Sequence, residues 1–109
     1  MAGHFEIETR SDGQFMFNLM VGSEAILTSE AYTTKAACVN GIESVKKNAP
    51  DNGRYRRTTT PEGRFRFALD AANGQAIGAS EYYETAGARD EAIEFVEKNA
   101  PDAEVKDLT

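Results

Sequence analysis

A six-residue pattern of hydroxyl, carboxyl and phenol side chains occurs twice in this chain. It reads Ser-Glu-x-Tyr-x-Thr in residues 29–34 and again in residues 80–85. Two carboxylates and two phenols brought to one groove could do acid–base chemistry, with glutamate as the acid or base and tyrosine as a hydrogen-bond donor. The repeated side chains are Ser29, Glu30, Tyr32, Thr34, Ser80, Glu81, Tyr83 and Thr85.

The same pattern has a structural interpretation, because each copy lies where an expected strand gives way to an expected helix. Serine and threonine at such a junction accept hydrogen bonds from free backbone N–H groups. A glutamate suits the positive end of the helix dipole, and a tyrosine packs beneath the helix. These roles account for every residue type in the pattern, so the structural interpretation is favoured and we expect no enzyme.

One cluster of basic side chains offers a second kind of chemistry. Residues 53–69 hold five arginines and one glutamate, a net charge of +4, whereas residues 70–109 carry a net charge of −7. Arginine binds phosphate and carboxylate groups through paired hydrogen bonds, and a tyrosine among arginines could stack on a nucleic-acid base. The candidate binding residues of this cluster are Arg54, Tyr55, Arg56, Arg57, Arg64 and Arg66.

The charge of the whole chain argues against a nucleic-acid partner. Its 109 residues include 18 Asp and Glu against 12 Lys and Arg, a net charge of −6, whereas proteins that bind the phosphate backbone are generally basic. Glu6 and Glu8 lie on the first expected strand of the first half, in the place that the arginines take in the second half. Cross-strand ion pairs between these two strands are therefore the favoured interpretation, and a binding strip is the alternative.

Two methionines indicate a third candidate surface. Met16 and Met20 alternate with apolar residues that are expected to point into the core. Both side chains should therefore lie on the opposite, open face of a sheet. A methionine pair on such a face favours a surface for a partner.

Composition limits the remaining classes of site. With one Cys and one His in the chain, no disulfide, structural zinc or iron–sulfur site is expected, and no cofactor. The common nucleotide-binding and zinc-hydrolase motifs are absent. No apolar run approaches the ~20 residues that cross a bilayer, and no secretory signal opens the sequence. We therefore expect a cytoplasmic protein without a membrane partner.

The elements that must position these residues are duplicated. A G-x-F-x-F-x-L segment occurs at residues 13–19 and 63–69, and an I-E-x-V-x-K-N-A-P-D segment at residues 42–51 and 93–102. Such self-similarity indicates internal duplication, and two copies are too few for an open solenoid. A closed arrangement with pseudo-twofold symmetry follows, in which each copy covers the apolar face of the other.

Each copy is predicted to contain three strands and a helix. Alternating apolar residues mark the central strand of each copy, and Asn73-Gly74 is a strong turn signal. Thr34 and Thr85 are expected to cap the two helices.

Each helix is expected to end at an asparagine in the left-handed conformation, before a proline that cannot continue the helix. These residues are Asn48 with Pro50, and Asn99 with Pro101. Residues 103–106 could add one short strand.

The two duplicated segments and the Ser-Glu-x-Tyr-x-Thr pattern together resemble the YegP-like proteins, a family of small bacterial proteins with one or two such repeats and no established activity. The resemblance covers nearly the whole chain. It implies β-β-β-α-β repeats joined in a single sheet, with the C-terminal strands exchanged between the halves. It implies no catalytic residues.

We therefore predict a single α+β domain over residues 1–109, with one repeat in residues 1–52 and the other in residues 53–109. One mostly antiparallel sheet should carry both helices on one face. The leading hypothesis is a monomeric, non-enzymatic module whose open sheet face binds an unknown protein or a small anionic ligand. Nucleic-acid binding through the arginines is the alternative. An enzyme that uses Glu30, Glu81, Tyr32 and Tyr83 comes third.

Overall fold

The two halves of the chain contain the same elements in the same order. The computed structural model describes residues 3–109. The first half comprises β1 (His4–Thr9), β2 (Phe15–Val21), β3 (Glu24–Ser29) and α1 (Lys35–Asn48). The second comprises β4 (Tyr55–Thr59), β5 (Phe65–Asp70), β6 (Ala76–Ala79) and α2 (Ala86–Asn99), followed by β7 (Glu104–Asp107). Short 3-10 helices at Asn52–Arg54 and Ala100–Asp102 follow α1 and α2. The predicted duplication is confirmed.

All seven strands form one sheet in the order β4-β5-β6-β3-β2-β1-β7. The halves meet at β3 and β6, where Thr28 pairs with Ala79 and Ser29 with Gly78. Strand β7, from the second half, pairs in parallel with β1 of the first, whereas the other neighbouring strands are antiparallel. The mostly antiparallel sheet and the exchanged C-terminal strand are thus confirmed.

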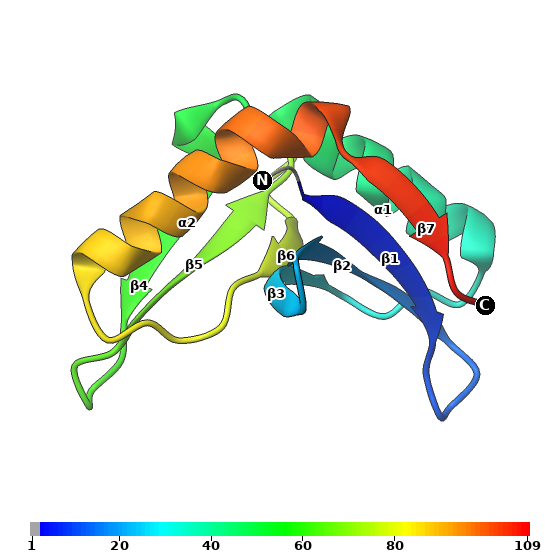
Figure 1. Cartoon of the computed structure of the whole chain (residues 1–109), viewed down its shortest axis with the longest axis horizontal. Coiled ribbons are helices and arrows are strands. Elements are labelled where there is room, and N and C mark those ends of the chain that lie inside the picture. Colours follow the sequence, from blue (N-terminus) through cyan, green and yellow to red (C-terminus); the bar gives the residue numbers. More distant parts are fainter. Residues whose placement is uncertain (1–2) are drawn as a thin grey trace.

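Both helices cover one face of the sheet (Figure 1). The two arms of the sheet slope away from the central strands β3 and β6, so the molecule has the outline of an arch with the helices on its outer side. The inner side of the arch is the open face of the sheet, as the sequence predicts. Among residues 3–109, no helix has the length and apolar character needed to cross a membrane.

The core lies between the helices and the sheet. Alternation places Phe17 and Leu19 of β2 beneath the helices, and Phe67 and Leu69 occupy the equivalent positions on β5. All four side chains are fully buried. Phe15 and Phe65 lie at the strand ends and are only partly buried.

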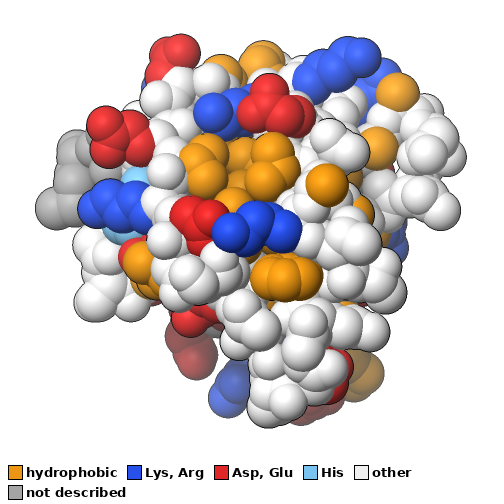
Figure 2. All heavy atoms as spheres, turned by 90° about the vertical axis from the view of Figure 1, so that its right-hand side faces the viewer, with side chains coloured by type: hydrophobic (Ala, Val, Ile, Leu, Met, Phe, Trp, Pro, Cys, Tyr) orange, Lys and Arg blue, Asp and Glu red, His pale blue; other side chains and the backbone are white. Residues whose placement is uncertain are grey.

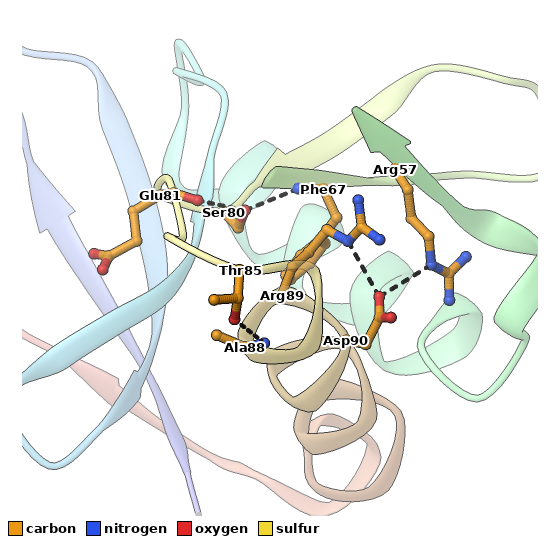
Figure 3. A network of polar contacts seen from close by, with 8 residues as sticks. All are labelled: Arg57, Phe67, Ser80, Glu81, Thr85, Ala88, Arg89 and Asp90. Atoms are coloured by element: carbon orange, nitrogen blue, oxygen red, sulfur yellow. Dashed lines mark hydrogen bonds and ion pairs between the residues drawn. The ribbon is translucent and has the colours of Figure 1, made fainter. Parts of the chain in front are cut away.

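The helices start and end at the predicted residues, but the predicted conformation of the final asparagines is wrong. The Thr34 hydroxyl accepts a hydrogen bond from the N–H of Ala37 at 3.1 Å, and Thr85 caps α2 in the same way (Figure 3). Neither asparagine adopts the left-handed conformation, since no residue other than glycine has a positive φ in the described chain. The side-chain amides of Asn48 and Asn99 instead donate to carbonyls of their own helices, four residues back.

Candidate functional site

The repeated serines tie each strand–helix junction to a central strand. The N–H of Phe17 donates to the Ser29 hydroxyl at 2.9 Å, and that hydroxyl donates to the carbonyl of Glu30 at 2.7 Å. Ser80 makes the same two bonds in the second half, where Figure 3 shows them. These bonds, together with the threonine caps, support the structural interpretation of the serines and threonines.

The repeated tyrosines pack toward the helices. Tyr32 exchanges two backbone hydrogen bonds with Phe15, and its ring stacks on Phe17 with a centroid distance of 6.3 Å. A Cβ at Gly41 of α1 would overlap the Tyr32 hydroxyl, so this glycine permits the close approach. Burial raises the pKa of Tyr32, and it raises the pKa of Tyr83 to about 12. Both phenols therefore remain protonated at neutral pH.

The repeated glutamates lie together at the open face of the sheet. Each glutamate lies four residues before the residue that caps the helix, Thr34 or Thr85, and outside the first helical turn. Glu30 and Glu81 instead line a hollow of about 330 Å³ together with Arg66 and residues of β3 and β6. The Tyr83 hydroxyl is buried and has no hydrogen-bond partner among residues 3–109. The structure thus brings the two carboxylates to one hollow without the two phenols.

A second hollow, of about 230 Å³, adjoins the first. Its lining includes Arg56 and Ala68, and it shares Glu30, Arg66 and Ala79 with the first hollow. The two together form one depression on the open face of β3, β5 and β6, which we call the central depression. It is the candidate site of the open face.

The predicted ion pairs between β1 and β4 do not form. Four strands separate β1 from β4 in the sheet, so Glu6 and Glu8 cannot reach the arginines. Arg56 points to the open face and contacts Asp70 through two hydrogen bonds of 3.1 and 3.2 Å. Arg57 points to the helix side, because it pairs with the buried Phe67, and reaches a carboxylate of α2, as Figure 3 shows.

The remaining arginines lie in separate places. Arg54 pairs with Asp51 at 3.4 Å beside the first 3-10 helix. Arg64 lies at the turn before β5 and lines a small hollow with Tyr82. Arg66 lies over the Tyr82 ring, 5.2 Å from its centroid, and contacts the hydroxyl at 3.4 Å. Only Arg56 and Arg66 share the central depression, so the five arginines do not form one basic strip.

Tyr55 cannot stack on a base, so this prediction is wrong. The residue pairs with Leu69, which places its ring on the helix side of the sheet, and the side chain is 6% exposed. Its hydroxyl donates to the carbonyl of Ala49 at 2.8 Å, and its ring packs edge-on against Phe67. Tyr55 is a core residue.

The two methionines do face the open side, but they do not form one apolar patch. Each is partly buried, and Asn18 lies between them on the same face. Its side chain bonds to Glu8 and Thr28 at 2.9 and 2.7 Å, which makes this part of the face polar. Met16 and Met20 therefore offer little apolar surface to a partner.

Exposed apolar side chains gather on another side of the molecule. Figure 2 shows hydrophobic atoms bordered by charged side chains on the side that α1 and β7 occupy in Figure 1. Val39 on α1 is 40% exposed, Val105 on β7 is 43% exposed and Leu108 is 58% exposed. These residues belong to none of the candidate sites predicted from the sequence.

Another hollow was also missed by sequence reasoning. It has a volume of about 530 Å³ and lies between α1 and the turn that joins β5 to β6. Its lining comprises Glu30, Tyr32, Gly41, Ser44, Ala71, Asn73, Gln75, Ala76 and Ile77. The sequence holds one indication of this hollow, because Ser44 of the first repeat corresponds to the much larger Phe95 of the second.

Residues 3–109 contain no group of three or more His, Cys, Asp or Glu side chains that could hold a metal ion. Cys38 is buried, and burial raises the pKa of its thiol. The thiolate form that acts as a nucleophile is thereby disfavoured.

Two stretches of the chain, residues 11–55 and 62–107, match the family described as "Domain of unknown function (DUF1508)". The chain belongs to the DUF1508 family. The first match covers β2, β3 and α1, and the second covers β5, β6, α2 and β7.

Relatives of similar length support this assignment. A UPF0339 protein of Bordetella pertussis is 53% identical over 110 residues, which span 100% of this chain and 98% of the relative. The UPF0339 protein YegP of Shigella flexneri is 48% identical over the full length of both chains. The resemblance to YegP-like proteins is confirmed.

Two solution NMR structures share the fold. The structure of yegP from Escherichia coli, described as a protein of unknown function, has a TM-score of 0.92 and 47% identity, and the match covers 100% of this chain and 95% of the other. A UPF0339 protein from Shewanella oneidensis has a TM-score of 0.94 and 43% identity, and covers 100% and 93%. These DUF1508 relatives carry no assigned activity.

Proposed function

We propose that this DUF1508 protein is a non-enzymatic binding module whose central depression holds a segment of a partner protein. The observation that carries the proposal is that two hollows on the open face share Glu30, Arg66 and Ala79. They form a continuous concave surface across three strands, on the face that the helices leave uncovered. A surface of this shape suits an elongated partner segment.

The charges of the central depression favour a segment that carries both signs. Neither Glu30 nor Glu81 forms an ion pair with any residue of the described chain, so both carboxylates are free to meet a cationic side chain. Arg66 contacts a phenol rather than a carboxylate and can meet an acidic side chain. A small anion would be repelled by the two glutamates. Complementary charges of both signs supply specificity in protein recognition.

Small side chains make room for a partner. Ala68, Ala76 and Ala79 line the depression and allow a partner chain to approach the sheet closely. The bidentate pair of Arg56 with Asp70 forms a fixed wall beside them.

A catalytic role finds less support in the geometry. Acid–base catalysis requires the acid and base to reach the same reacting atoms. The Tyr83 hydroxyl is buried away from the depression that contains Glu81, so of the two glutamate–tyrosine pairs only Glu30 and Tyr32 line a hollow together. The repeated glutamates and tyrosines therefore do not converge as a pair of equivalent acid–base sets.

The module is proposed to act as a cytoplasmic monomer. A free thiol at Cys38 suits a reducing compartment. The duplication supplies in one chain the pairing of two halves at β3 and β6, which a single repeat could obtain only from a second chain. Light scattering should give a monomer mass across a wide range of concentrations, and a stable dimer would contradict this.

Affinity capture with three baits tests the proposal. The wild-type protein, Arg66→Glu and the control Arg64→Glu are each presented to a cytosolic extract of the native cells. Both variants change the charge equally, but Arg64 lies outside the central depression. We expect a partner that the wild type and Arg64→Glu retain and that Arg66→Glu loses. Capture of the same proteins by all three baits would show that the depression is not the binding surface.

A further inference from the structure

The hollow beside α1 lies where the two halves of the sheet separate. Pairing between β3 and β6 is limited to two residue pairs, and the chain leaves β3 at Glu30. The chain from Glu30 to Tyr32, the turn after β5 and the helix α1 then border an open hollow of about 530 Å³. This hollow shares only Glu30 and Ala76 with the central depression, and Arg66 takes no part in it.

The pseudo-twofold supplies an internal comparison for this hollow. Phe95 of α2 corresponds to Ser44 of α1, and Ala92 corresponds to Gly41. The Phe95 ring packs against the core at the end of β2, 3.1 Å from where a Cβ on Gly3 would lie. Strand β2 is the counterpart of β5, which borders the hollow. An aromatic ring thus fills in one half the space that a serine leaves open in the other.

The polar groups around the hollow are free to bind a ligand. The Ser44 hydroxyl oxygen accepts from the amide of Asn48 at 3.3 Å, so its O–H can donate into the hollow. The Asn73 side-chain oxygen accepts from the backbone of Gln75 at 3.0 Å, which leaves its N–H groups available. Burial raises the pKa of Tyr32, so its phenol is a protonated donor.

The charge of the lining selects the class of ligand. Glu30 is the single ionisable carboxylate among the lining residues, and none of them is Lys, Arg or His. Glu30 forms no ion pair within residues 3–109. A cationic group can therefore pair with it through a charge-assisted hydrogen bond. Ile77, Ala71 and Ala76 provide an apolar wall, and the volume lies within the usual range for small-molecule sites, about 300–1,000 Å³.

We propose that this hollow binds a small polyhydroxylated amine. Its ammonium group pairs with the Glu30 carboxylate, and its hydroxyl groups bond to the Ser44 hydroxyl and to the side-chain amides of Asn73 and Gln75. The hollow shares Glu30 with the central depression, but Ser44, Asn73 and Gln75 line this hollow and not the depression.

A titration with glucosamine, followed by NMR of the backbone amides, tests the proposal. The pH is kept below the pKa of the sugar amine so that the ammonium form is present. A ligand of about a dozen heavy atoms in an open hollow should bind with a Kd of about 1 mM. We expect saturable shifts confined to residues that line the hollow. Glucose, which lacks the ammonium group, should bind at least about tenfold more weakly.

Variants locate the site. Ser44→Phe copies the second repeat and should abolish the shifts, whereas Val39→Phe adds the same ring on the exposed side of α1 and should not. Glu30→Gln keeps the shape of an exposed side chain and should reduce glucosamine affinity to that of glucose. Glu30→Gln still tests the proposal if Ser44→Phe fails to fold. Ser44→Phe should leave capture of the partner segment unchanged, because Ser44 lines this hollow and not the central depression, and this separates the two proposals.

Three outcomes would overturn the proposal. The first is the absence of saturable shifts up to about 50 mM, well above the expected Kd. The second is equal affinity for glucosamine and glucose, which would remove the role of Glu30. The third is unchanged binding by a folded Ser44→Phe, or by Glu30→Gln.

Discussion

The backbone N–H of Phe67 donates to the hydroxyl of Ser80 at 2.9 Å, and the same hydroxyl donates to the carbonyl of Glu81 at 2.8 Å. One small side chain thus satisfies two backbone groups where the chain leaves β6 and crosses toward α2. The bond from Phe67 is buried, so this N–H cannot replace Ser80 with bulk water. This relationship explains why the repeat places serine at the end of its third strand.

Ser80→Ala should therefore destabilise the protein by about 1–3 kcal/mol, because it leaves the buried N–H of Phe67 without a partner. Ser29→Ala should cost less, since Ser29 is only partly buried. Ser23→Ala, in the exposed turn after β2, is the matched control and should change the free energy of unfolding by less than about 0.5 kcal/mol. Chemical denaturation measures all three. Equal effects at Ser80 and Ser23 would contradict this account.

Phe67→Ala should cost about 3–5 kcal/mol, because the ring is fully buried and packs against Tyr55. That is a large share of the roughly 5–15 kcal/mol that holds a domain together. Phe65→Ala removes the same ring from a partly buried position on the same strand and should cost clearly less. Thermal unfolding followed by circular dichroism gives the comparison. A loss at Phe65 as large as that at Phe67 would show that the core has been assigned wrongly.

The sequence predicted those features that depend on neighbours along the chain. The alternation around Phe17 and Phe67 identified the central strands, and Thr34 and Thr85 identified the helix starts, because strand period and helix capping are local properties. The duplication extended each inference to the other half.

Features that depend on the order of strands in the sheet could not be predicted in this way. The pairing of Glu6 with the arginines assumed that β1 lies near β4, whereas the two strands lie near opposite edges of the sheet. Arg56 and Arg57 are adjacent in sequence but point to opposite faces, so a charged run along a strand does not make a charged surface. The same alternation places the side chains of Tyr55 and Arg57 on the helix side of the sheet, where Tyr55 is buried.

The dispersal of the arginines predicts that nucleic acid does not bind at physiological salt. Only Arg56 and Arg66 face the central depression, and Arg56 is already paired with Asp70. At about 150 mM salt, screening limits charge interactions to about 8 Å. Arg56 and Arg66 alone are then not enough to hold a phosphate backbone. A fluorescence titration with single-stranded oligonucleotides at low and physiological salt checks this. Micromolar binding at about 150 mM that weakens in Arg66→Ala would favour the nucleic-acid alternative.

The buried hydroxyl of Tyr83 should make the stability of the fold depend on pH in the alkaline range. Burial, with smaller contributions from Glu81 and Glu24, raises the pKa of Tyr83 to about 12, whereas an unfolded tyrosine titrates near 10. The unfolded chain therefore loses this proton first. The stabilisation associated with the protonated phenol is complete below about pH 10 and disappears as the pH rises through about 12.

Tyr83→Phe should remove this loss and also raise stability at neutral pH. The variant deletes a buried hydroxyl that has no hydrogen-bond partner, and the gain should be up to about 1 kcal/mol because part of the side chain is exposed. Urea unfolding at pH 7 and at several values between 10 and 12 measures both effects. The exposed neighbour gives the matched control Tyr82→Phe, which should leave the pH profile as it is. A destabilised Tyr83→Phe would mean that the hydroxyl has a partner in solution, such as a bound water, and would contradict its assignment as an unsatisfied group.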